Sequence, residues 1–370
     1  MTDTWQARVS PILTEITNSS AVPGFVIAVA RGIRPPEFLT QGADADGRQL
    51  SVDTLLPVAS ITKLATTLAI LRLAAAGKLD LSDTLARQLP DARAAHYPVT
   101  LRELLSHSAG MPGDLAAKLA PYGPGLDWPA LAQACLHTAP TRPVGARVHY
   151  SNVGIGLLAI VVERRSGRAF PEALSELVLD PLGIEGYLGG EPPRPVAKIA
   201  GDFGEHAGTA VEPVNSAFWR SLALPWGGLV TTADGALRLI RAFSGAPTGF
   251  ISPVLLQEAT SSQTTHLAGG YFPPLMWQRC DWGLGVEVRG AKAPHWTPPT
   301  ASPSSFGHPG SSGCLAWADP DANIAWVMCG LRGFLSWWQT WANIGAAIFR
   351  ARVSARYHVS RISYLVLRKT

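Results

Sequence analysis

The stretch "VASITKLATT", residues 58–67, places a serine and a lysine three positions apart where an apolar helical pattern begins. Apolar residues recur at helical spacing from Ile61 onward, and Gly77 marks the end of this predicted helix. Two interpretations of Ser60 are open at this point. It could be the N-cap of a buried helix, or it could be a nucleophile whose proton is taken by Lys63.

The position of this serine–lysine pair adds weight to the second interpretation. Residues three apart lie on one face of a helix, and the positive end of the helix dipole disfavours a protonated Lys63, which lowers its pKa. The same helix end offers free backbone N–H groups for a developing oxyanion. Average residue usage produces roughly one such Ser-x-x-Lys pattern per chain of this length by chance. Further motifs are therefore needed to choose between a capping serine and a nucleophile.

The overall composition describes a globular protein with a large core. The chain has 370 residues, of which 47% are hydrophobic and 16% are charged, which suits one large domain or two closely packed ones without long disordered tracts. The net charge of +4 comes from arginines that are scattered along the sequence. We therefore predict no nucleic-acid partner.

The sequence also gives expectations about location and cofactors. The first sixteen residues lack the basic start and apolar run of a secretion signal, and the longest apolar run, 153–162, is too short to span a bilayer. We expect a cytoplasmic protein with no membrane partner. The four cysteines form no C-x-x-C pair and predict neither a metal site nor a disulfide framework; they are Cys135, Cys280, Cys314 and Cys329.

Strand patterns lie near both ends of the chain, and helical patterns dominate the middle. Residues 81–199 alternate helical patterns with Pro/Gly-rich loops and predict a mostly helical domain. Residues 1–80 and 200–350 together predict a domain whose sheet is built from both ends of the chain. The tail, 351–370, receives no predicted element. The predicted strands are 24–32, 37–43, 282–288, 313–319 and 323–330, and a closing helix is predicted over 337–349.

A second candidate motif, Tyr150-Ser151-Asn152, sits where a loop enters an apolar helical stretch. A tyrosine beside a lysine can transfer a proton at neutral pH if the cation lowers the pKa of the phenol; the alternative is an amphipathic tyrosine that closes a loop. The overlapping glycines at 154 and 156 imitate a dinucleotide-binding fingerprint, but no acidic residue follows at the ribose position. We interpret these glycines as contacts for close helix packing.

A third candidate motif, His308-Pro309-Gly310, opens a strand that continues through an Asp-Pro turn into another strand. Proline removes a donor from the strand ladder and glycine allows a ligand to approach the backbone, as a strand lining a cleft requires. Taken alone, His308 could equally be a core or surface histidine. The competing His206-Ala207-Gly208 is followed by no strand pattern and is predicted to be a loop outside the cleft.

Together and in this order, the three motifs resemble the serine β-lactamase and penicillin-binding protein superfamily, whose set is S-x-x-K, a central S-D-N and K-T-G. The variant here, with Tyr-Ser-Asn and His-Pro-Gly, is similar to the class C β-lactamase branch and to the family VIII carboxylesterases. Residues 101–112, 179–184 and 225–240 are also similar to stretches of that family. The resemblance runs from about residue 20 to 350, and it implies an α+β fold in which helices flank an antiparallel sheet and a mostly helical region is inserted.

The resemblance also implies a site. Ser60 would attack a carbonyl carbon while Lys63 and Tyr150 together remove its proton, without any cofactor or metal. The backbone N–H groups of Ser60 and Ser311 would hold the oxyanion, and Asn152 would hold Lys63 or the substrate. His308 and Gly310 would line the substrate-binding cleft.

The expected function is hydrolysis of short-chain carboxylic esters with weak or absent β-lactamase activity. A neutral histidine at 308 gives less fixed positive charge to a β-lactam carboxylate than lysine would. Aromatic cleft walls favour apolar acyl groups, and we expect about half of six tryptophans to supply them: 226, 277, 282, 296, 337 and 338. The alternatives are an acyltransferase, a D-peptidase or β-lactamase on the same fold, and an inactive penicillin-binding receptor; the sequence leaves the oligomeric state open.

Overall fold

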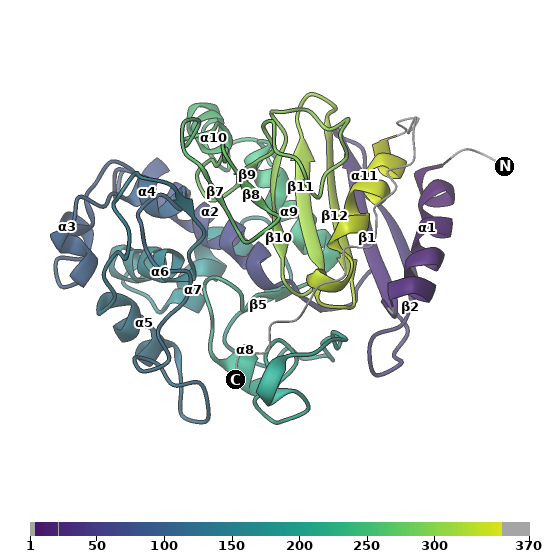
Figure 1. Cartoon of the computed structure of the whole chain (residues 1–370), viewed down its shortest axis with the longest axis horizontal. Helices are drawn as coiled ribbons and strands as arrows, with labels where there is room; N and C mark the ends of the chain where they lie inside the picture. Colours follow the sequence, from purple (N-terminus) through teal and green to yellow (C-terminus); the bar gives the residue numbers. More distant parts are fainter. Residues whose placement is uncertain (1–3, 21, 350–370) are drawn as a thin grey trace.

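A six-stranded antiparallel sheet joins the two ends of the chain in the computed structural model, which describes residues 4–20 and 22–349. Its strand order is β2-β1-β12-β11-β10-β9 (Figure 1). The strands are β1 (Gly24–Arg31), β2 (Glu37–Gly42), β9 (Glu287–Val288), β10 (Phe306–Gly310), β11 (Cys314–Asp319) and β12 (Ile324–Gly330). The α+β class with an antiparallel sheet is therefore confirmed, while the tail at 351–370 lies outside the described residues.

Both faces of this sheet are buried, and alternation along the strands divides the core in two. In β1, alternate residues from Phe25 to Val29 join one hydrophobic cluster and those from Val26 to Ala30 join the other. This is the period-2 pattern of a strand covered on both faces. The cluster that contains Phe25 lies against α1 (Trp5–Ser20) and α11 (Trp341–Phe349), while α9 (Ala233–Phe243) packs on the other face.

The two faces differ in side-chain size. Large aromatic residues, including Phe25, Trp317 and Trp326, face α1 and α11. Alanines dominate the opposite face, namely Ala28, Ala30, Ala316, Ala318 and Ala325. Because the spacing of packed elements follows the size of the side chains between them, small residues let α9 lie close to the sheet.

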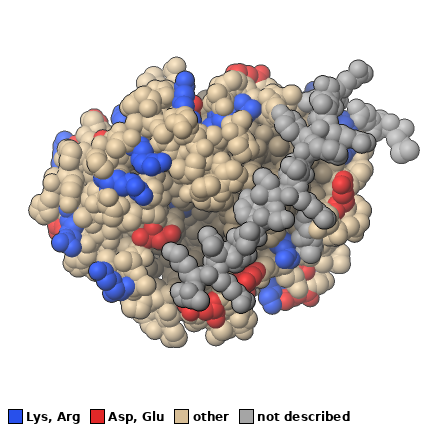
Figure 2. Space-filling view, viewed as in Figure 1, with Lys and Arg blue, Asp and Glu red and all other residues tan. Residues whose placement is uncertain are grey.

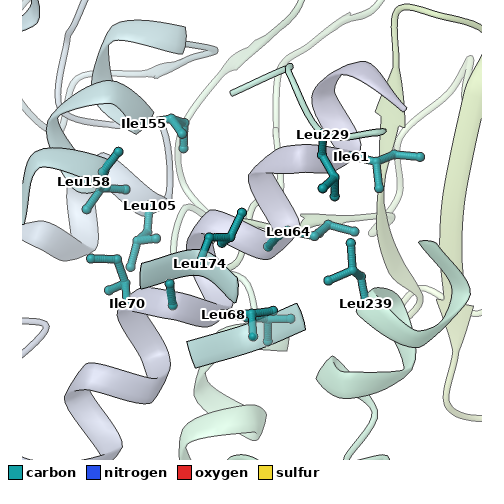
Figure 3. Close-up of a cluster of buried hydrophobic side chains, with 14 of the residues drawn as sticks. Ile61, Leu64, Leu68, Ile70, Leu105, Ile155, Leu158, Leu174, Leu229 and Leu239 are labelled. Atoms are coloured by element: carbon teal, nitrogen blue, oxygen red, sulfur yellow. The ribbon is translucent and has the colours of Figure 1, made fainter. Parts of the chain in front are cut away.

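Helix α2 (Thr62–Ala75) lies at the centre of the second cluster. All residues from Thr62 to Leu71 are buried, so this helix is covered on every side. Gly77 follows its end with φ +68°, as predicted for the residue after a C-cap. Figure 3 shows side chains from α2 packing with those of the helices around it; the labelled residues are Ile61, Leu64, Leu68, Ile70, Leu105, Ile155, Leu158, Leu174, Leu229 and Leu239.

The remaining elements are short. The middle of the chain contributes α3 (Leu85–Gln88), α4 (Leu101–Leu105), α5 (Trp128–Leu136), α6 (Asn152–Ser166) and α7 (Phe170–Leu174), and α8 (Ala217–Ser221) and α10 (Pro253–Thr260) follow later. One small sheet contains β3 (Leu56–Pro57), β6 (Val230–Thr231) and β5 (Gly186–Tyr187). The other contains β4 (Val148–His149), β7 (Gly269–Gly270) and β8 (Met276–Trp277). The domain boundaries near 80 and 200 stay a prediction.

Two predicted elements are shorter than expected. The strand predicted over 282–288 is only the two-residue β9, because the preceding backbone bonds elsewhere: Leu284 donates to the Ala259 carbonyl and Gly285 to that of Leu105. The helix predicted over 337–349 begins at Trp341, because Trp337, with φ −152° and ψ 2°, is not helical and a short 3₁₀ turn follows it. In both segments, tertiary hydrogen bonds or packing outweigh the local pattern.

The face of the molecule seen in Figure 2 shows no concentration of basic residues among the described residues. Lys and Arg side chains are interspersed with acidic ones across the face visible in Figure 2. Within residues 4–20 and 22–349, none of the helices combines the length and the apolar character needed to cross a membrane.

Of the two glycines of α6, only Gly156 has the packing role that we predicted for both. A Cβ atom on Gly156 would lie 2.5 Å from Cys135 Sγ, whereas one on Gly154 would meet nothing closer than Leu104 at 3.5 Å. Gly156 therefore allows α5 to lie against α6.

These two glycines give a matched test of that packing. Both Gly154→Ala and Gly156→Ala gain about 1 kcal/mol of helix propensity, but only Gly156→Ala overpacks the α5 contact, which costs about 1–3 kcal/mol. We expect Gly156→Ala to be less stable than Gly154→Ala by about that amount in urea unfolding. Equal stabilities would contradict the packing role.

Candidate active site

Three segments far apart in the sequence meet at one cavity of about 290 Å³. Ser60 comes from the turn before α2, Tyr150 from the loop before α6, and Gly310 from the end of β10. The cavity is lined by Ser60, Gly113, Asp114, His149, Tyr150, Asn152, Tyr271, Phe272, Trp296, Pro309, Gly310, Ser311 and Phe334. The competing His206 lies in a separate 3₁₀ turn and does not line this cavity, as predicted.

Ser60 is not a helix cap. It lies inside a 3₁₀ turn, Ala59–Ile61, that leads directly into α2, and the residues at the two N-cap positions, Val58 and Ile61, form no side-chain capping bond. Its side chain is instead half-buried at the cavity, where its Oγ lies 3.0 Å from Lys63 Nζ. The capping interpretation of this serine is therefore wrong.

The turn that presents Ser60 is strained and well supported. Ala59 has φ +47°, a left-handed conformation that costs a non-glycine residue about 1–2 kcal/mol. The Thr62 hydroxyl donates to the Ala59 carbonyl at 2.6 Å and accepts from the Leu229 N–H at 3.0 Å. Such strain at a site persists only when the surrounding structure holds it. The sequence analysis missed this role of Thr62.

Lys63 is buried completely, and its amine has two polar neighbours among the described residues. It donates to the Trp226 carbonyl at 2.7 Å and lies 3.0 Å from Ser60 Oγ. Burial holds the pKa of Lys63 well below its usual 10.5, although the negative charge of Asp114 acts in the opposite direction. A neutral amine has a lone pair, so Lys63 can accept the Ser60 proton.

Tyr150 stands over this pair. Lys63 Nζ lies 4.8 Å from the centre of the Tyr150 ring. Burial raises the pKa of the Tyr150 phenol above its usual 10, which hydrogen bonding with Ser60 offsets only in part. The phenol is therefore protonated at neutral pH. We expected a lysine cation to lower the pKa of this phenol, but burial is the dominant cause for both groups: it raises the pKa of Tyr150 and lowers that of Lys63.

His308 is fully buried beside Tyr150, with its Nε2 3.5 Å from the tyrosine hydroxyl. Burial is the main cause that lowers the pKa of His308 to about 3, so the imidazole is neutral at pH 7. Its Nδ1 lies 2.6 Å from the Pro309 carbonyl, which can only accept a hydrogen bond. The proton is therefore on Nδ1, and Nε2 is left as an acceptor toward Tyr150.

A histidine that sequence reasoning missed holds the loop of Tyr150. His107, which is 2% exposed, accepts a hydrogen bond from the Ser151 N–H through Nδ1, and its carbonyl accepts from the His149 N–H. Its ring centre lies 4.7 Å from that of Tyr150. Burial keeps the pKa of His107 well below its usual 6.5. His107 lies within the stretch 101–112, whose similarity to the family gave this histidine no role.

The backbone around Gly310 fits an oxyanion site. β10 pairs with β9 only through Phe306 and Gly307, so its later residues have a free edge toward the turn of Ser60. A Cβ atom on Gly310 would lie 2.4 Å from the Val58 carbonyl oxygen. Among the described residues, neither the Ser60 N–H nor the Ser311 N–H has a hydrogen-bond acceptor. Both donors are therefore available to a ligand.

Asn152 lies in the cavity wall but does not hold Lys63. Its Nδ2 donates to Asp114 Oδ1 at 2.5 Å, and its Oδ1 is buried without a partner among the described residues. A carboxylate can only accept, so Asp114 fixes the orientation of this amide. The proposed contact of Asn152 with Lys63 is wrong, and its contact with substrate stays a prediction.

The aromatic wall differs from the expected one. Of the six tryptophans considered, only Trp296 lines the cavity. Trp282 and Trp337 are core residues, Trp277 and Trp338 are at least 92% buried, and Trp226 contributes its carbonyl to Lys63. The other aromatic wall residues are Tyr150, Tyr271, Phe272 and Phe334.

The buried ion pair of Glu287 and Lys292 contacts the wall residue Tyr271. Glu287 accepts from Lys292 Nζ at 2.8 Å and from the Tyr271 hydroxyl at 3.1 Å. Burial alone would raise the pKa of Glu287, but Lys292 and His295 lower it to about 2. Tyr271 is thereby held with its ring centre 4.9 Å from that of Tyr150. Within residues 4–20 and 22–349, no three His, Cys, Asp or Glu side chains gather as metal ligands.

Relatives with known names carry the same fold. The chain is 29% identical over 357 residues to esterase EstB of Burkholderia gladioli, with 84% of each chain covered. It is 25% identical over 327 residues to penicillin-binding protein 4 of Amycolatopsis lactamdurans, covering 84% of this chain and 79% of that one.

Solved structures of similar proteins superpose on this chain. A β-lactamase of Mycobacterium bovis superposes with a TM-score of 0.63 at 26% identity, covering 91% of this chain and 98% of the other. EstCE1, described as a hydrolase with promiscuous acyltransferase activity, superposes with a TM-score of 0.73 at 21% identity, covering 94% and 99%. The sequence profile of the Beta-lactamase family matches residues 9–330. The chain therefore belongs to the beta-lactamase family and is a serine hydrolase of that superfamily.

Proposed function

We propose that this protein is a carboxylesterase that cleaves short-chain esters through an acyl-enzyme on Ser60. The observation that carries the proposal is the fully buried amine of Lys63, which lies 3.0 Å from the Oγ of Ser60, a residue that lines the cavity. A serine hydroxyl is a weak nucleophile until a neighbouring base accepts its proton. The likeness to esterase EstB supports this substrate class.

Acylation begins when Ser60 Oγ attacks the ester carbonyl and its proton passes to Lys63 Nζ. The carbonyl oxygen becomes negative and accepts hydrogen bonds from the Ser60 and Ser311 N–H groups. Tyr150 then gives its hydroxyl proton to the leaving alkoxide and regains one from Lys63. Because the Tyr150 phenol is protonated in the resting enzyme, it serves as an acid at this step.

Deacylation reverses these transfers with water in place of the alcohol. Water attacks the acyl carbon, its proton passes through Tyr150 and Lys63, and Ser60 regains a proton as the carboxylic acid leaves. The other titratable side chains among the described residues of the cavity wall are Asp114, His149 and Tyr271. The same Lys63–Tyr150 pair therefore serves both half-reactions.

The cavity favours small substrates without negative charge. Its volume of about 290 Å³ is at the low end of small-molecule sites. Its walls are largely aromatic, and no Lys or Arg is among the described residues that line it. A β-lactam carboxylate would meet Asp114 and no cation among these residues. His308, which we predicted to line the cleft, is fully buried and does not line this cavity. A cytoplasmic location stays a prediction from the sequence.

The function is tested by comparing a butyrate ester with a cephalosporin on one preparation. We expect kcat/KM for the cephalosporin to be at least about tenfold lower, because two like charges 8 Å apart near a protein surface repel by about 2 kcal/mol. Ser60→Ala should abolish turnover and labelling by a fluorophosphonate while folding normally. An equal or higher cephalosporin value, or an active Ser60→Ala, would overturn the proposal.

The Lys63–Tyr150 pair predicts a particular pH profile. Lys63 is active without its proton, so kcat/KM should rise with pH through the lowered pKa of Lys63 and reach its plateau below 10.5. Lys63→Ala and Tyr150→Phe should each remove most activity. The double variant should be little less active than either single variant, because the losses of activity from two residues that act as one unit do not add. Multiplicative losses would indicate separate roles.

Gly310 tests the oxyanion site. Gly310→Ala brings a methyl group within 2.4 Å of the Val58 carbonyl and must move the Ser311 N–H. We expect kcat to fall about 10²–10³-fold, as for the loss of one oxyanion donor. Gly333→Ala, whose nearest atom is the Ser311 oxygen at 3.8 Å, and His206→Ala are controls that should keep normal rates. Thermal melting distinguishes a local effect from unfolding.

A further inference from the structure

Asp114 introduces a negative charge into a cavity that is otherwise aromatic and uncharged. It is the only Asp, Glu, Lys or Arg among the described residues that line the cavity. In the part of the chain that the structure describes, its carboxylate forms no ion pair within 4 Å. It accepts a hydrogen bond from the side-chain amide of Asn152 at 2.5 Å. The mechanism proposed for Ser60 does not use this charge.

A buried acceptor stands beside this carboxylate. Because Asn152 donates its Nδ2 to Asp114, its Oδ1 is the remaining polar atom, and it has no partner among the described residues. Two neighbouring acceptors, one of them negative, match a group that has several donors and no acceptor. An ammonium group has this property.

The surrounding walls also favour a cation. Tyr150, Tyr271 and Trp296 line the same cavity, and aromatic faces attract ammonium groups by about 0.5–1 kcal/mol at exposed sites. Asp114 and Ser60 line one cavity of about 290 Å³, so a cation bound at Asp114 would lie close to the scissile ester. The charge of Asp114 also acts on the reacting centre, because it opposes the lowering of the Lys63 pKa.

We propose that Asp114 is a specificity-determining residue that selects ester substrates carrying an ammonium group near the scissile bond. This inference rests on the proposed esterase function and names its substrate class more narrowly. Asp114 acts on binding rather than on bond cleavage, so the preference should appear mainly in KM. Neutral short-chain esters remain substrates of lower kcat/KM, and esters with a second carboxylate are disfavoured.

The test uses substrates of equal shape and different charge. Ethyl 4-aminobutyrate, ethyl pentanoate and monoethyl glutarate differ in the charge at the end of the acyl chain. Dimethylaminopropyl butyrate and 4-methylpentyl butyrate are the corresponding cationic and neutral pair on the alcohol side. In at least one series we expect a preference of about five- to tenfold in kcat/KM for the cationic ester over the neutral one.

Asp114→Asn keeps the contact with Asn152 and removes the charge. We expect it to reduce the cationic-to-neutral ratio to about one, and to move the rising limb of the pH profile of the neutral ester to lower pH, since Asp114 raises the pKa of Lys63. Glu15→Gln is the matched control, because it removes an exposed carboxylate from α1, which does not line the cavity. This variant should keep the wild-type ratio.

The outcomes separate this inference from the proposed function. If both series show no preference for the cation, or if Asp114→Asn keeps the wild-type preference, the inference is overturned while Ser60-dependent hydrolysis of butyrate still supports the esterase. If no ester is hydrolysed with dependence on Ser60, the proposed function itself fails. A preference that also disappears in Glu15→Gln would reflect the charge of the whole protein and would overturn the role of Asp114.

Discussion

The desolvated amine of Lys63 is the constraint on which the rest of the site depends. A lysine with no exposed surface keeps its charge only at a large cost in free energy, and the described structure offers it one carbonyl and one hydroxyl rather than a carboxylate partner. Burial therefore favours the neutral form of the amine. This state requires α2 to be covered on every side and the Trp226 carbonyl to approach within 2.7 Å.

The same burial determines the protonation of the neighbouring groups. Tyr150 keeps its phenol proton, and His308 stays neutral with its proton on Nδ1. Lys63 can therefore act as the base toward Ser60, and the phenol of Tyr150 holds the proton that serves as the acid, while Nε2 of His308 remains an acceptor toward Tyr150. Proton transfer from Ser60 creates charge only in the transition state, where preorganised N–H donors stabilise it most effectively.

The sequence predicted the parts of the molecule that depend on local pattern. The strands from 24, 314 and 324 and the helix from 62 follow from periodicity and turn residues, because their burial repeats along the chain. Ser60, Lys63 and Tyr150 were found because three short motifs occurred in one order. His107 was missed because its role is a hydrogen bond to a loop 44 residues later, which leaves no local signal.

The prediction that several tryptophans line the cleft failed for a different reason. Composition shows that aromatic residues are present but not which of them face the core: Trp282 and Trp337 are core residues, and the large aromatic residues of the sheet lie against α1 and α11. The opposite face of the sheet has alanines, so α9 and the turn of Ser60 can lie close to it. That approach brings the turn of Ser60 against β10, where only glycine at 310 leaves room for the Val58 carbonyl. The nucleophile is therefore positioned by small residues, while the large ones stabilise the opposite layer.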